Sequence, residues 1–158
     1  MAVKAIPDGY HSVTPYLIVK GADRAINFYK EVFGASQRMR MDGPNGTVGH
    51  AEIEIDGSAV MLADEFPDMG CRSPQSIGGT GVSLHLYVKD VDSCFSRAVA
   101  AGAKVLRPVQ DQFYGDRAGT VEDPFGHVWT ISTHKEDLSP EELRNRAEAV
   151  MKQQGGQS

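Results

Sequence analysis

Two related stretches decide the fold, YLIVKGAD at residues 16–23 and HLYVKDVD at residues 85–92. They align at an offset of 69 residues, and further on Gly34-Ala35 aligns with Gly102-Ala103 at an offset of 68. This spacing is far longer than the 20–50 residues that are typical of stacked solenoid repeats. The sequence therefore predicts two related half-domains within one chain.

Each half begins with the pattern of a strand followed by a helix. In the second half Leu84, Leu86 and Val88 alternate with polar neighbours, which is the period of a half-buried strand. Apolar residues then recur at spacings of three and four over residues 22–33 and 91–99, as on one face of a helix. Asp90 is a candidate N-cap of the second helix, and Gly34 and Gly102 are candidate C-terminal residues.

Short strands and turns follow each predicted helix. Gly43–Gly46 and Asp123–Gly126 are rich in turn residues, and Asp56-Gly57 is the pair favoured in two-residue hairpins. Each half therefore has the order βαβββ. A last helix is predicted from Pro140 to about Gln153, with Ser139 as its N-cap.

These elements predict an α+β fold in which two paired βαβββ modules form an open, barrel-like sheet that bears a cleft. The single domain is expected to span residues 1–137, with modules at about 10–66 and 81–134 and a connector at 67–80. Residues 138–158 are expected to form the C-terminal helix and a flexible tail. Within the modules Pro15, Leu17, Val19, Ile53 and Ile55 are expected to pack against a helix.

Composition narrows the class of protein. The chain has 158 residues, 41% of them hydrophobic and 23% charged, and a net charge of -5, which does not suit nucleic acid or an anionic membrane surface as a partner. No apolar run spans a bilayer and the N-terminus lacks a signal-peptide core, so we expect a cytoplasmic protein. Cys71 and Cys94 form no metal or disulfide motif, and reduced thiols are expected.

A four-stranded sheet with one helix leaves one of its faces uncovered. Alternation assigns polar and aromatic side chains to that face, and two such faces side by side would line a concave surface for a small molecule. The residues assigned to it are Thr14, Tyr16, Ile18, His50, Glu52, Glu54, Ser83, His85, Tyr87, Val128, Thr130 and Ser132.

At this level of detail the sequence resembles a known family. The stretches YLIVKGADRAINFYKEVFGA, HLYVKDVDSCFSRAVAAGA and VEDPFGHVWTI are similar to the vicinal oxygen chelate superfamily, which holds glyoxalase I, bleomycin-resistance proteins and extradiol dioxygenases. The stretches SPQSIGGTGVSLHLYV, YGDRAGTVEDPFGH and STHKEDLSPEEL resemble its PhnB-like branch. The resemblance covers about residues 10–134 and implies a cleft that binds a small organic molecule, and a homodimer.

Enzymes of this superfamily hold a divalent metal with His, Gln or Glu from the first and last strands of each half. The corresponding positions here are Thr14, Ser83, Thr130 and a residue near Leu62, with Asp64 close by. Hydroxyl and aliphatic side chains bind catalytic transition metals poorly. The usual four-ligand site is therefore expected to be missing, and no cofactor is expected at it.

Alternation offers a displaced set of donors. His50 and Glu52 share one strand face, and His85 comes from the other half, so the three could hold Zn, Ni or Mn. Glu52 would then be the general base of a lyase or isomerase. The alternative is that the two histidines hydrogen-bond a ligand and that Glu52 is solvated.

Other candidates have simpler alternatives. Tyr114 and Arg117 stand at the ends of the stretch Tyr114-Gly115-Asp116-Arg117 and could reach a bound anion, although Arg117 could equally form a surface ion pair. Asp123–Gly126 is interpreted as turn chemistry alone. His11, His127 and His134 lie near strand ends and are expected to be exposed, whereas Trp129 and Cys94 are expected in the core.

Three functions therefore remain open. The first is a glyoxalase/bleomycin-resistance-like protein that binds a small organic molecule, with substrate-binding residues Thr14, Tyr16, His50, Ser83, His85, Tyr87, Tyr114, Arg117 and Thr130. The second is a metal-dependent lyase or isomerase that uses Glu52. The third is a non-enzymatic module that binds a partner through the apolar stripe of the C-terminal helix, which includes Leu143, Ala147 and Val150-Met151.

Overall fold

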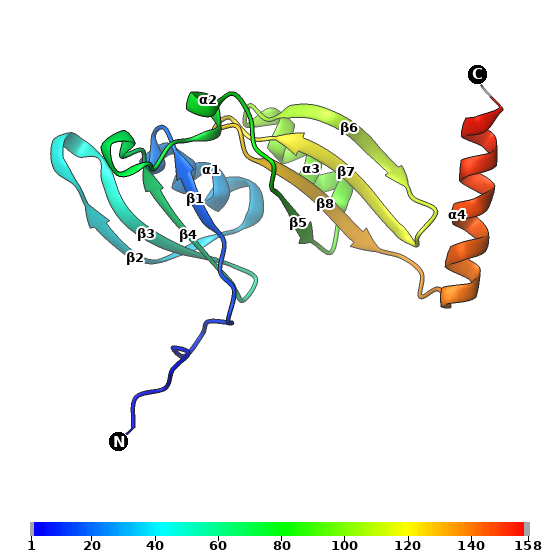
Figure 1. The fold of residues 1–158 in the computed structure, drawn as a ribbon, viewed down its shortest axis with the longest axis horizontal. Coiled ribbons are helices and arrows are strands. Elements are labelled where there is room, and N and C mark those ends of the chain that lie inside the picture. Colours follow the sequence, from blue (N-terminus) through cyan, green and yellow to red (C-terminus); the bar gives the residue numbers. More distant parts are fainter. Residues whose placement is uncertain (1, 157–158) are drawn as a thin grey trace. The chain divides into compact units, whose positions relative to one another are not determined.

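The computed structural model describes residues 2–156 and divides the chain into two compact units. Unit 1 contains residues 2–82 together with 123–127, and unit 2 contains residues 83–122 and 128–156. Among the described residues the chain forms two four-stranded sheets and four α-helices, which confirms the predicted α+β class (Figure 1). The last two residues of the predicted tail, 157 and 158, lie outside the described part of the chain.

Unit 1 is a mixed sheet with one helix against it. The strand order is β1-β4-β3-β2, and β1 runs parallel to β4 whereas the other neighbours are antiparallel. The elements are β1 (Tyr16–Val19), α1 (Ala22–Phe33), β2 (Ser36–Asp42), β3 (Val48–Ile55) and β4 (Ser58–Asp64).

The apolar stripe of α1 covers one face of this sheet, as the sequence predicts. Leu17, Val19, Ile53 and Ile55 are buried, and the helix ends at Gly34, whose φ of 68° places it in the left-handed conformation of a helix C-cap. Pro15 was predicted to pack with them and is exposed, because it precedes the first residue of β1.

The predicted hairpin between β3 and β4 is also present. Asp56 and Gly57 both have positive φ values, 43° and 85°, which is the backbone that a type I′ turn requires.

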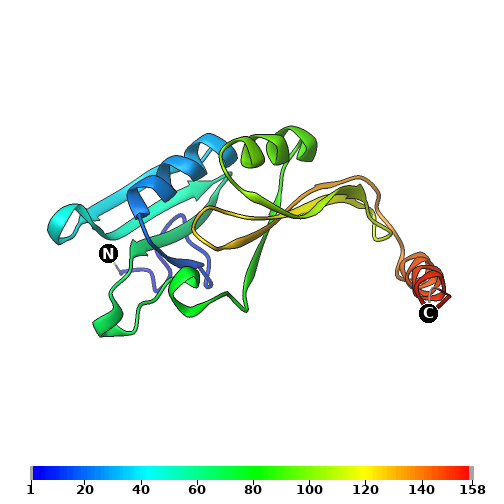
Figure 2. The same ribbon diagram turned by 90° about the horizontal axis from the view of Figure 1, so that it is seen from above.

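Unit 2 repeats this arrangement and adds a helix. Its strand order is β5-β8-β7-β6, again with one parallel pair, β5 and β8. In Figure 2, α3 lies on one side of its sheet and α4 stands apart from it. The elements are β5 (Ser83–Tyr87), α3 (Val91–Ala100), β6 (Lys104–Asp111), β7 (Asp116–Glu122), β8 (Val128–His134) and α4 (Pro140–Gly155).

The turn between β7 and β8, residues 123–127, belongs to unit 1. Asp123 accepts hydrogen bonds from the backbone N–H groups of Phe125 and His127 and from the hydroxyl of Tyr29 on α1. The Phe125 ring packs edge-on against Phe28 of α1. The turn chemistry predicted for Asp123–Gly126 is present, and its side chains also complete the apolar layer of the first unit.

The prediction of an exposed His127 was wrong. The residue is only 8% exposed, and its Nε2 lies 2.9 Å from the carbonyl oxygen of Ile18 on β1. A carbonyl only accepts, so Nε2 carries the proton and donates. His127 therefore joins the turn to the first strand of unit 1.

The connector is more ordered than its composition predicts. It contains a 3₁₀ turn at Pro67–Met69 and a one-turn helix, α2, at Pro74–Ile77. Glu65 accepts from the backbone N–H of Ser73, and its hydrogen bonds with Ser73 and Ser76 lower the pKa of Glu65 to about 2. A carboxylate that accepts these bonds anchors the connector to the end of β4.

Helix α4 begins where the sequence predicts and runs two residues further. Ser139 caps it by accepting from the backbone N–H of Glu142. No residue of α4 is buried, and Leu143 and Met151 of its apolar stripe are exposed. Arg146 ties the helix to its own unit through Glu136 and the carbonyl oxygen of Phe113.

None of the helices formed by residues 2–156 is long and apolar enough to cross a bilayer.

Candidate functional site

The helix-free face of unit 1 carries a connected group of polar side chains. The Tyr16 hydroxyl lies 2.8 Å from Nδ1 of His50, and Nε2 of His50 lies 3.5 Å from Oε1 of Glu52. Tyr10, which precedes β1, donates its hydroxyl hydrogen to Oε2 of Glu52 at 2.7 Å. Burial raises the pKa of Tyr16, so this phenol stays protonated near neutral pH. The sequence-predicted residues Tyr16, His50 and Glu52 therefore lie together.

Arg38 closes the edge of this group. Its guanidinium forms an ion pair with Glu54 and a hydrogen bond to the carbonyl oxygen of Gly9, and it lies 5.1 Å from the centre of the Tyr10 ring. This cation–π contact and the carboxylate both hold the guanidinium in place. The charge of Arg38 is therefore already neutralised within the unit.

The helix-free face of unit 2 is lined by paired hydroxyl and imidazole groups. The Ser132 hydroxyl lies 2.8 Å from Nε2 of His85, and Ser132 is fully buried whereas His85 is exposed. The hydroxyls of Thr120 and Thr130 lie 3.0 Å apart. Ser132 therefore fixes the orientation of an imidazole whose outer edge meets solvent.

A second chain of hydrogen bonds on this unit is centred on Asp116, which is 4% exposed. Its Oδ2 accepts from the hydroxyl of Tyr87 at 2.8 Å, and its Oδ1 accepts from Nδ1 of His134 at 2.7 Å. The second ring nitrogen of His134 lies 2.8 Å from Asp137. Carboxylates only accept, so His134 donates from both nitrogens, and these bonds raise its pKa.

His134 and Asp116 were not assigned to the site from the sequence. His134 was predicted to be exposed, and it is half-exposed but held by two carboxylates. Asp116 could have been found by extending the alternation back along β7 from Thr120, because both lie on the same face. Tyr10 lies outside every strand and helix of the fold, so no periodic pattern points to it.

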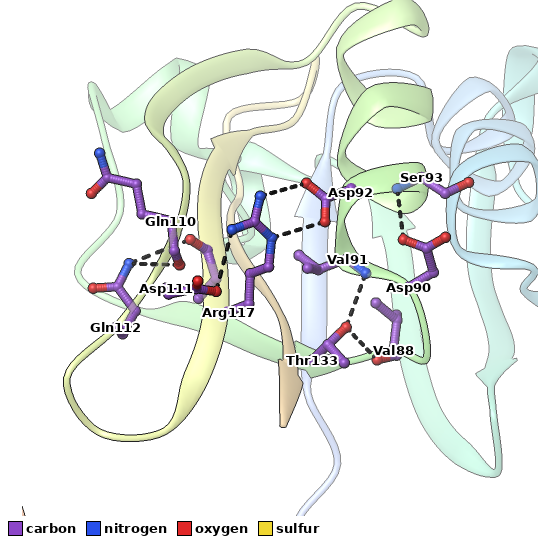
Figure 3. A network of polar contacts seen from close by, with 11 residues as sticks. Val88, Asp90, Val91, Asp92, Ser93, Gln110, Asp111, Gln112, Arg117 and Thr133 are labelled. Carbon is purple, nitrogen blue, oxygen red and sulfur yellow. Dashed lines mark hydrogen bonds and ion pairs between the residues drawn. The ribbon is translucent and has the colours of Figure 1, made fainter. Parts of the chain in front are cut away.

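Arg117 lies on the opposite, helix-covered side of β7. Its guanidinium forms two hydrogen bonds of 2.9 Å with Asp92 of α3 and one of 3.2 Å with Asp111 of β6 (Figure 3). The guanidinium lowers the pKa of the Asp92 carboxyl. This placement favours the surface ion pair over the predicted contact with an anion.

The loop before Asp116 explains why a glycine is required there. Gly115 has a φ of 96°, and a Cβ at this position would lie 2.6 Å from the carbonyl oxygen of Glu136. Tyr114, a predicted ligand contact, is partly exposed beside it, and burial raises its pKa. The loop conformation thus holds Tyr114 and Asp116 on either side of a glycine that no other residue can replace without strain.

The four positions that correspond to metal ligands do not fit a divalent transition metal. Thr130 pairs with His85 in unit 2, and in unit 1 Met61 pairs with Tyr16, the residue that aligns with His85. The fourth position is therefore Met61, while Leu62 faces α1 and is fully buried. With Thr14 and Ser83 at the first strands, the set is two threonines, a serine and a methionine, which are poor ligands for such ions.

The displaced donor set is divided between the units. His50 and Glu52 lie on β3, and His85 lies on β5. Within residues 2–156 no group of three or more His, Cys, Asp or Glu side chains is placed to hold a metal ion. The set of His50, Glu52 and His85 therefore stays a prediction from the sequence, and so does general base catalysis by Glu52.

The two residues that the sequence analysis assigns to the core are buried. Trp129 is 2% exposed and Cys94 is 1% exposed. Burial raises the pKa of the Cys94 thiol, which keeps it in the unreactive protonated form. Both residues are structural, as predicted.

Residues 9–131 match the model of the family described as the Glyoxalase/Bleomycin resistance protein/Dioxygenase superfamily. An uncharacterised protein of Mycobacterium tuberculosis is 42% identical over 158 residues, which cover 98% of this chain and 88% of the relative. An uncharacterised protein of Arabidopsis thaliana is 28% identical over 124 residues, or 74% of each chain.

Solved structures show the same fold. TioX from Micromonospora sp. ML1 has a TM-score of 0.60 and 30% identity, covering 78% of this chain and 98% of TioX. FosX from Listeria monocytogenes, solved with Mn(II) and 1S,2S-dihydroxypropylphosphonic acid, has a TM-score of 0.60 at 19% identity, covering 85% and 94% of the two chains. On the family match, the mycobacterial relative and this shared fold, the chain belongs to the glyoxalase/bleomycin resistance protein/dioxygenase superfamily.

Proposed function

We propose that this protein binds a small organic molecule through the polar residues on the helix-free faces of its sheets. The observation that carries the proposal is the pair formed by Ser132 and His85, in which a fully buried hydroxyl orients an exposed imidazole at 2.8 Å. Binding sites need polar groups whose own orientation is fixed before the ligand arrives. A sheet face of this kind supports recognition rather than simple packing.

Unit 2 would supply three kinds of contact. His85 and Tyr87 have ring centres 4.8 Å apart and together offer an aromatic surface with polar edges. Thr130 and Ser83 lie on the same face, on the neighbouring strands β8 and β5. Tyr114 on the adjoining loop would contribute a further partly exposed ring.

Unit 1 would supply the contacts of Tyr16, His50 and Glu52, with Thr14 two residues before β1. Two carboxylates, Glu52 and Glu54, lie on this face. Glu54 is paired with Arg38, whereas Glu52 accepts from Tyr10 and has no arginine partner. A ligand that meets this face would therefore find an acceptor and an imidazole side by side.

The test is a screen of small metabolites against the full chain labelled with ¹⁵N, followed by amide chemical shifts. We expect ligands to shift the amides of residues 83–87 and to raise the melting temperature by mass action. His85→Ala should weaken binding at least tenfold while the melting temperature of the free protein changes little.

Ser96→Ala is the matched control, because Ser96 is an exposed residue of α3 on the other side of the same unit. It should leave binding unchanged. Shifts confined to α3 or α4, or equal affinity in His85→Ala, would contradict the proposal.

A further inference from the structure

The hydrogen-bond assignment of Tyr87 limits what kind of ligand the face of unit 2 can accept. Tyr87 is 55% exposed, and its hydroxyl hydrogen points to Oδ2 of Asp116 at 2.8 Å. An ionised carboxylate cannot donate, so the direction of this bond is fixed. The phenol oxygen therefore shows solvent its lone pairs and not its hydrogen.

Asp116 is itself held in this role. Its other oxygen accepts from Nδ1 of His134 at 2.7 Å, and His134 also donates to Asp137. The aspartate side chain is 5% exposed, so it has a strong need for both donors. The bond to Asp116 raises the pKa of Tyr87, which agrees with a phenol whose hydrogen is committed to a carboxylate.

In unit 1, too, side-chain hydrogen-bond donors are already occupied by carboxylates of the protein. The Tyr10 hydrogen is donated to Glu52, and the Arg38 guanidinium is occupied by Glu54. In unit 2, Arg117 is occupied by Asp92 and Asp111. With a net charge of -5, the protein also repels anions at long range.

On the basis of the proposed function, we propose that the ligand is an uncharged or cationic molecule that presents O–H or N–H donors to Tyr87, such as an alcohol, an amide or an amine. Asp116 is the positioning residue that sets this preference. At Tyr87 a phosphonate, phosphate or carboxylate would meet lone pairs instead of a donor. The preference follows from the direction of one hydrogen bond, so it can be reversed by changing Asp116 alone.

Two pairs of probes test the preference on the full chain. The first pair, 1-phenylethanol and acetophenone, shares one carbon skeleton and differs in whether the oxygen can donate. The second pair, benzylamine and benzoate, differs in charge. One hydrogen bond changes affinity by about 3- to 10-fold, so the amides of residues 83–87 should respond to 1-phenylethanol at about 3- to 10-fold lower concentration than to acetophenone. Benzylamine should likewise bind more tightly than benzoate.

The variants separate Tyr87 from its surroundings. Tyr87→Phe should abolish the difference within the first pair, and Ser96→Ala, an exposed position on α3 away from this face, should keep it. In Asp116→Asn the amide can accept from His134 and donate to the phenol, which frees the Tyr87 hydrogen. The affinity for acetophenone should therefore rise relative to the affinity for 1-phenylethanol. Acetophenone or benzoate binding as tightly as its partner in the unaltered protein would overturn the inference.

A ligand-independent readout distinguishes this inference from the proposed function. The pKa of Tyr87, followed by NMR of ¹³Cζ-labelled tyrosine, should fall in Asp116→Asn, because the carboxylate that disfavours the phenolate is gone. An unchanged Tyr87 pKa would overturn the inference directly. If that pKa falls and none of the four probes shifts residues 83–87, the proposed function fails while the assignment of the phenol hydrogen stands.

Discussion

The helices of the two units begin at aligned positions but are capped by different residues. Gly21 of unit 1 aligns with Asp90 of unit 2. Asp90 caps α3 itself by accepting from the backbone N–H of Ser93. Gly21 has no side chain, and α1 is capped instead by Asp64 of β4, which accepts from the backbone N–H groups of Gly21 and Ala22.

The counterpart of Asp64 in unit 2 is Thr133 of β8. Its hydroxyl accepts from the backbone N–H of Val91 at the start of α3 and donates to the carbonyl oxygen of Val88 (Figure 3). Asp64 also accepts from the backbone N–H of Val48. The two units therefore keep the same fold although the residue that caps the helix lies before the helix in unit 2 and on the strand β4 in unit 1.

The units also differ in how their cores are completed. Unit 1 takes residues 123–127 into its apolar layer, and its largest fully buried side chains include Tyr29, Ile26 and Ile53. In unit 2, Leu84 and Leu86 of the first strand remain partly exposed within the chain. We therefore expect substitutions in unit 1 to cost more stability than the equivalent substitutions in unit 2.

Asp123→Ala should have the largest effect, because it would break the attachment of the turn to unit 1. Two backbone N–H groups and the Tyr29 hydroxyl would lose their acceptor in a buried place, at a cost of about 3–5 kcal/mol. Urea unfolding measures this loss. Pro124→Ala in the same turn is exposed and should cost little, and equal costs for the two variants would contradict the role of Asp123.

The aligned pair Leu17 and Leu86 sharpens the comparison of the cores. Leu17 is 5% exposed, so Leu17→Ala should lower the free energy of unfolding by about 3 kcal/mol. Leu86 is partly exposed, so Leu86→Ala should lower it by about 1–2 kcal/mol. Chemical denaturation of both variants under identical conditions gives the difference. A larger loss for Leu86→Ala would mean that the cores rank in the opposite order.

The helix caps provide the next matched pair. Asp64→Ala removes an acceptor of three backbone N–H groups and should cost about 2 kcal/mol, while Thr133→Ala should cost about 1 kcal/mol. Asp64→Asn keeps one acceptor oxygen and should fall between them. Hydrogen exchange at the first turns of α1 and α3 would show where each loss occurs, and exchange that rises at the wrong helix would refute the assignment.

A pH titration should separate the units further, because the carboxylate-held His134 belongs to unit 2. Its pKa is raised above the ordinary value by Asp116, then by Asp137. The stabilisation is therefore fully present below about pH 6.5, the unfolded value, and is lost as the pH rises through the folded value. In His134→Gln the melting temperature should depend less on pH above about 6.5. A pH profile identical to that of the unaltered protein would exclude this role.

The smallest effect is expected from ending the chain at Asp137, which removes α4, an element without a counterpart in unit 1. No residue of α4 is buried, and its ion pairs are exposed, so the unfolding free energy should change by about 0.5 kcal/mol or less. Light scattering on both chains tests whether α4 holds the homodimer that the resemblance to the family implies. A strongly lowered melting temperature in monomeric protein would contradict the weak attachment of α4 to its unit.

The sequence predicts much of this fold because its signals are local. The offset of 69 residues, the Asp90 cap and the Asp56-Gly57 turn each depend on a few neighbouring residues, and each is present in the structure. Alternation also assigned Leu17 to the helix side and Tyr16 to the other face. Short-range periodicity is sufficient for these features.

The missed features depend on partners distant in sequence. His127 is buried because it reaches Ile18, 109 residues away. The surface ion pair left open for Arg117 does form, but its partner Asp92, on α3, could not be named from the sequence. No pattern around either residue contains this information. The Asp116 network joins three strands and a loop, and only the register between those strands places its members together.

The turn at residues 123–127 has a consequence for the order in which the chain folds during synthesis. On the ribosome, residues 2–82 emerge long before the five residues that complete their apolar layer. By the time His127 emerges, the chain of α3 and of strands β5, β6 and β7 has also been made. Domains of a nascent chain usually fold in order from the N-terminus. Here the first unit cannot finish before most of the second has been synthesised, so the two units should reach their native state almost together.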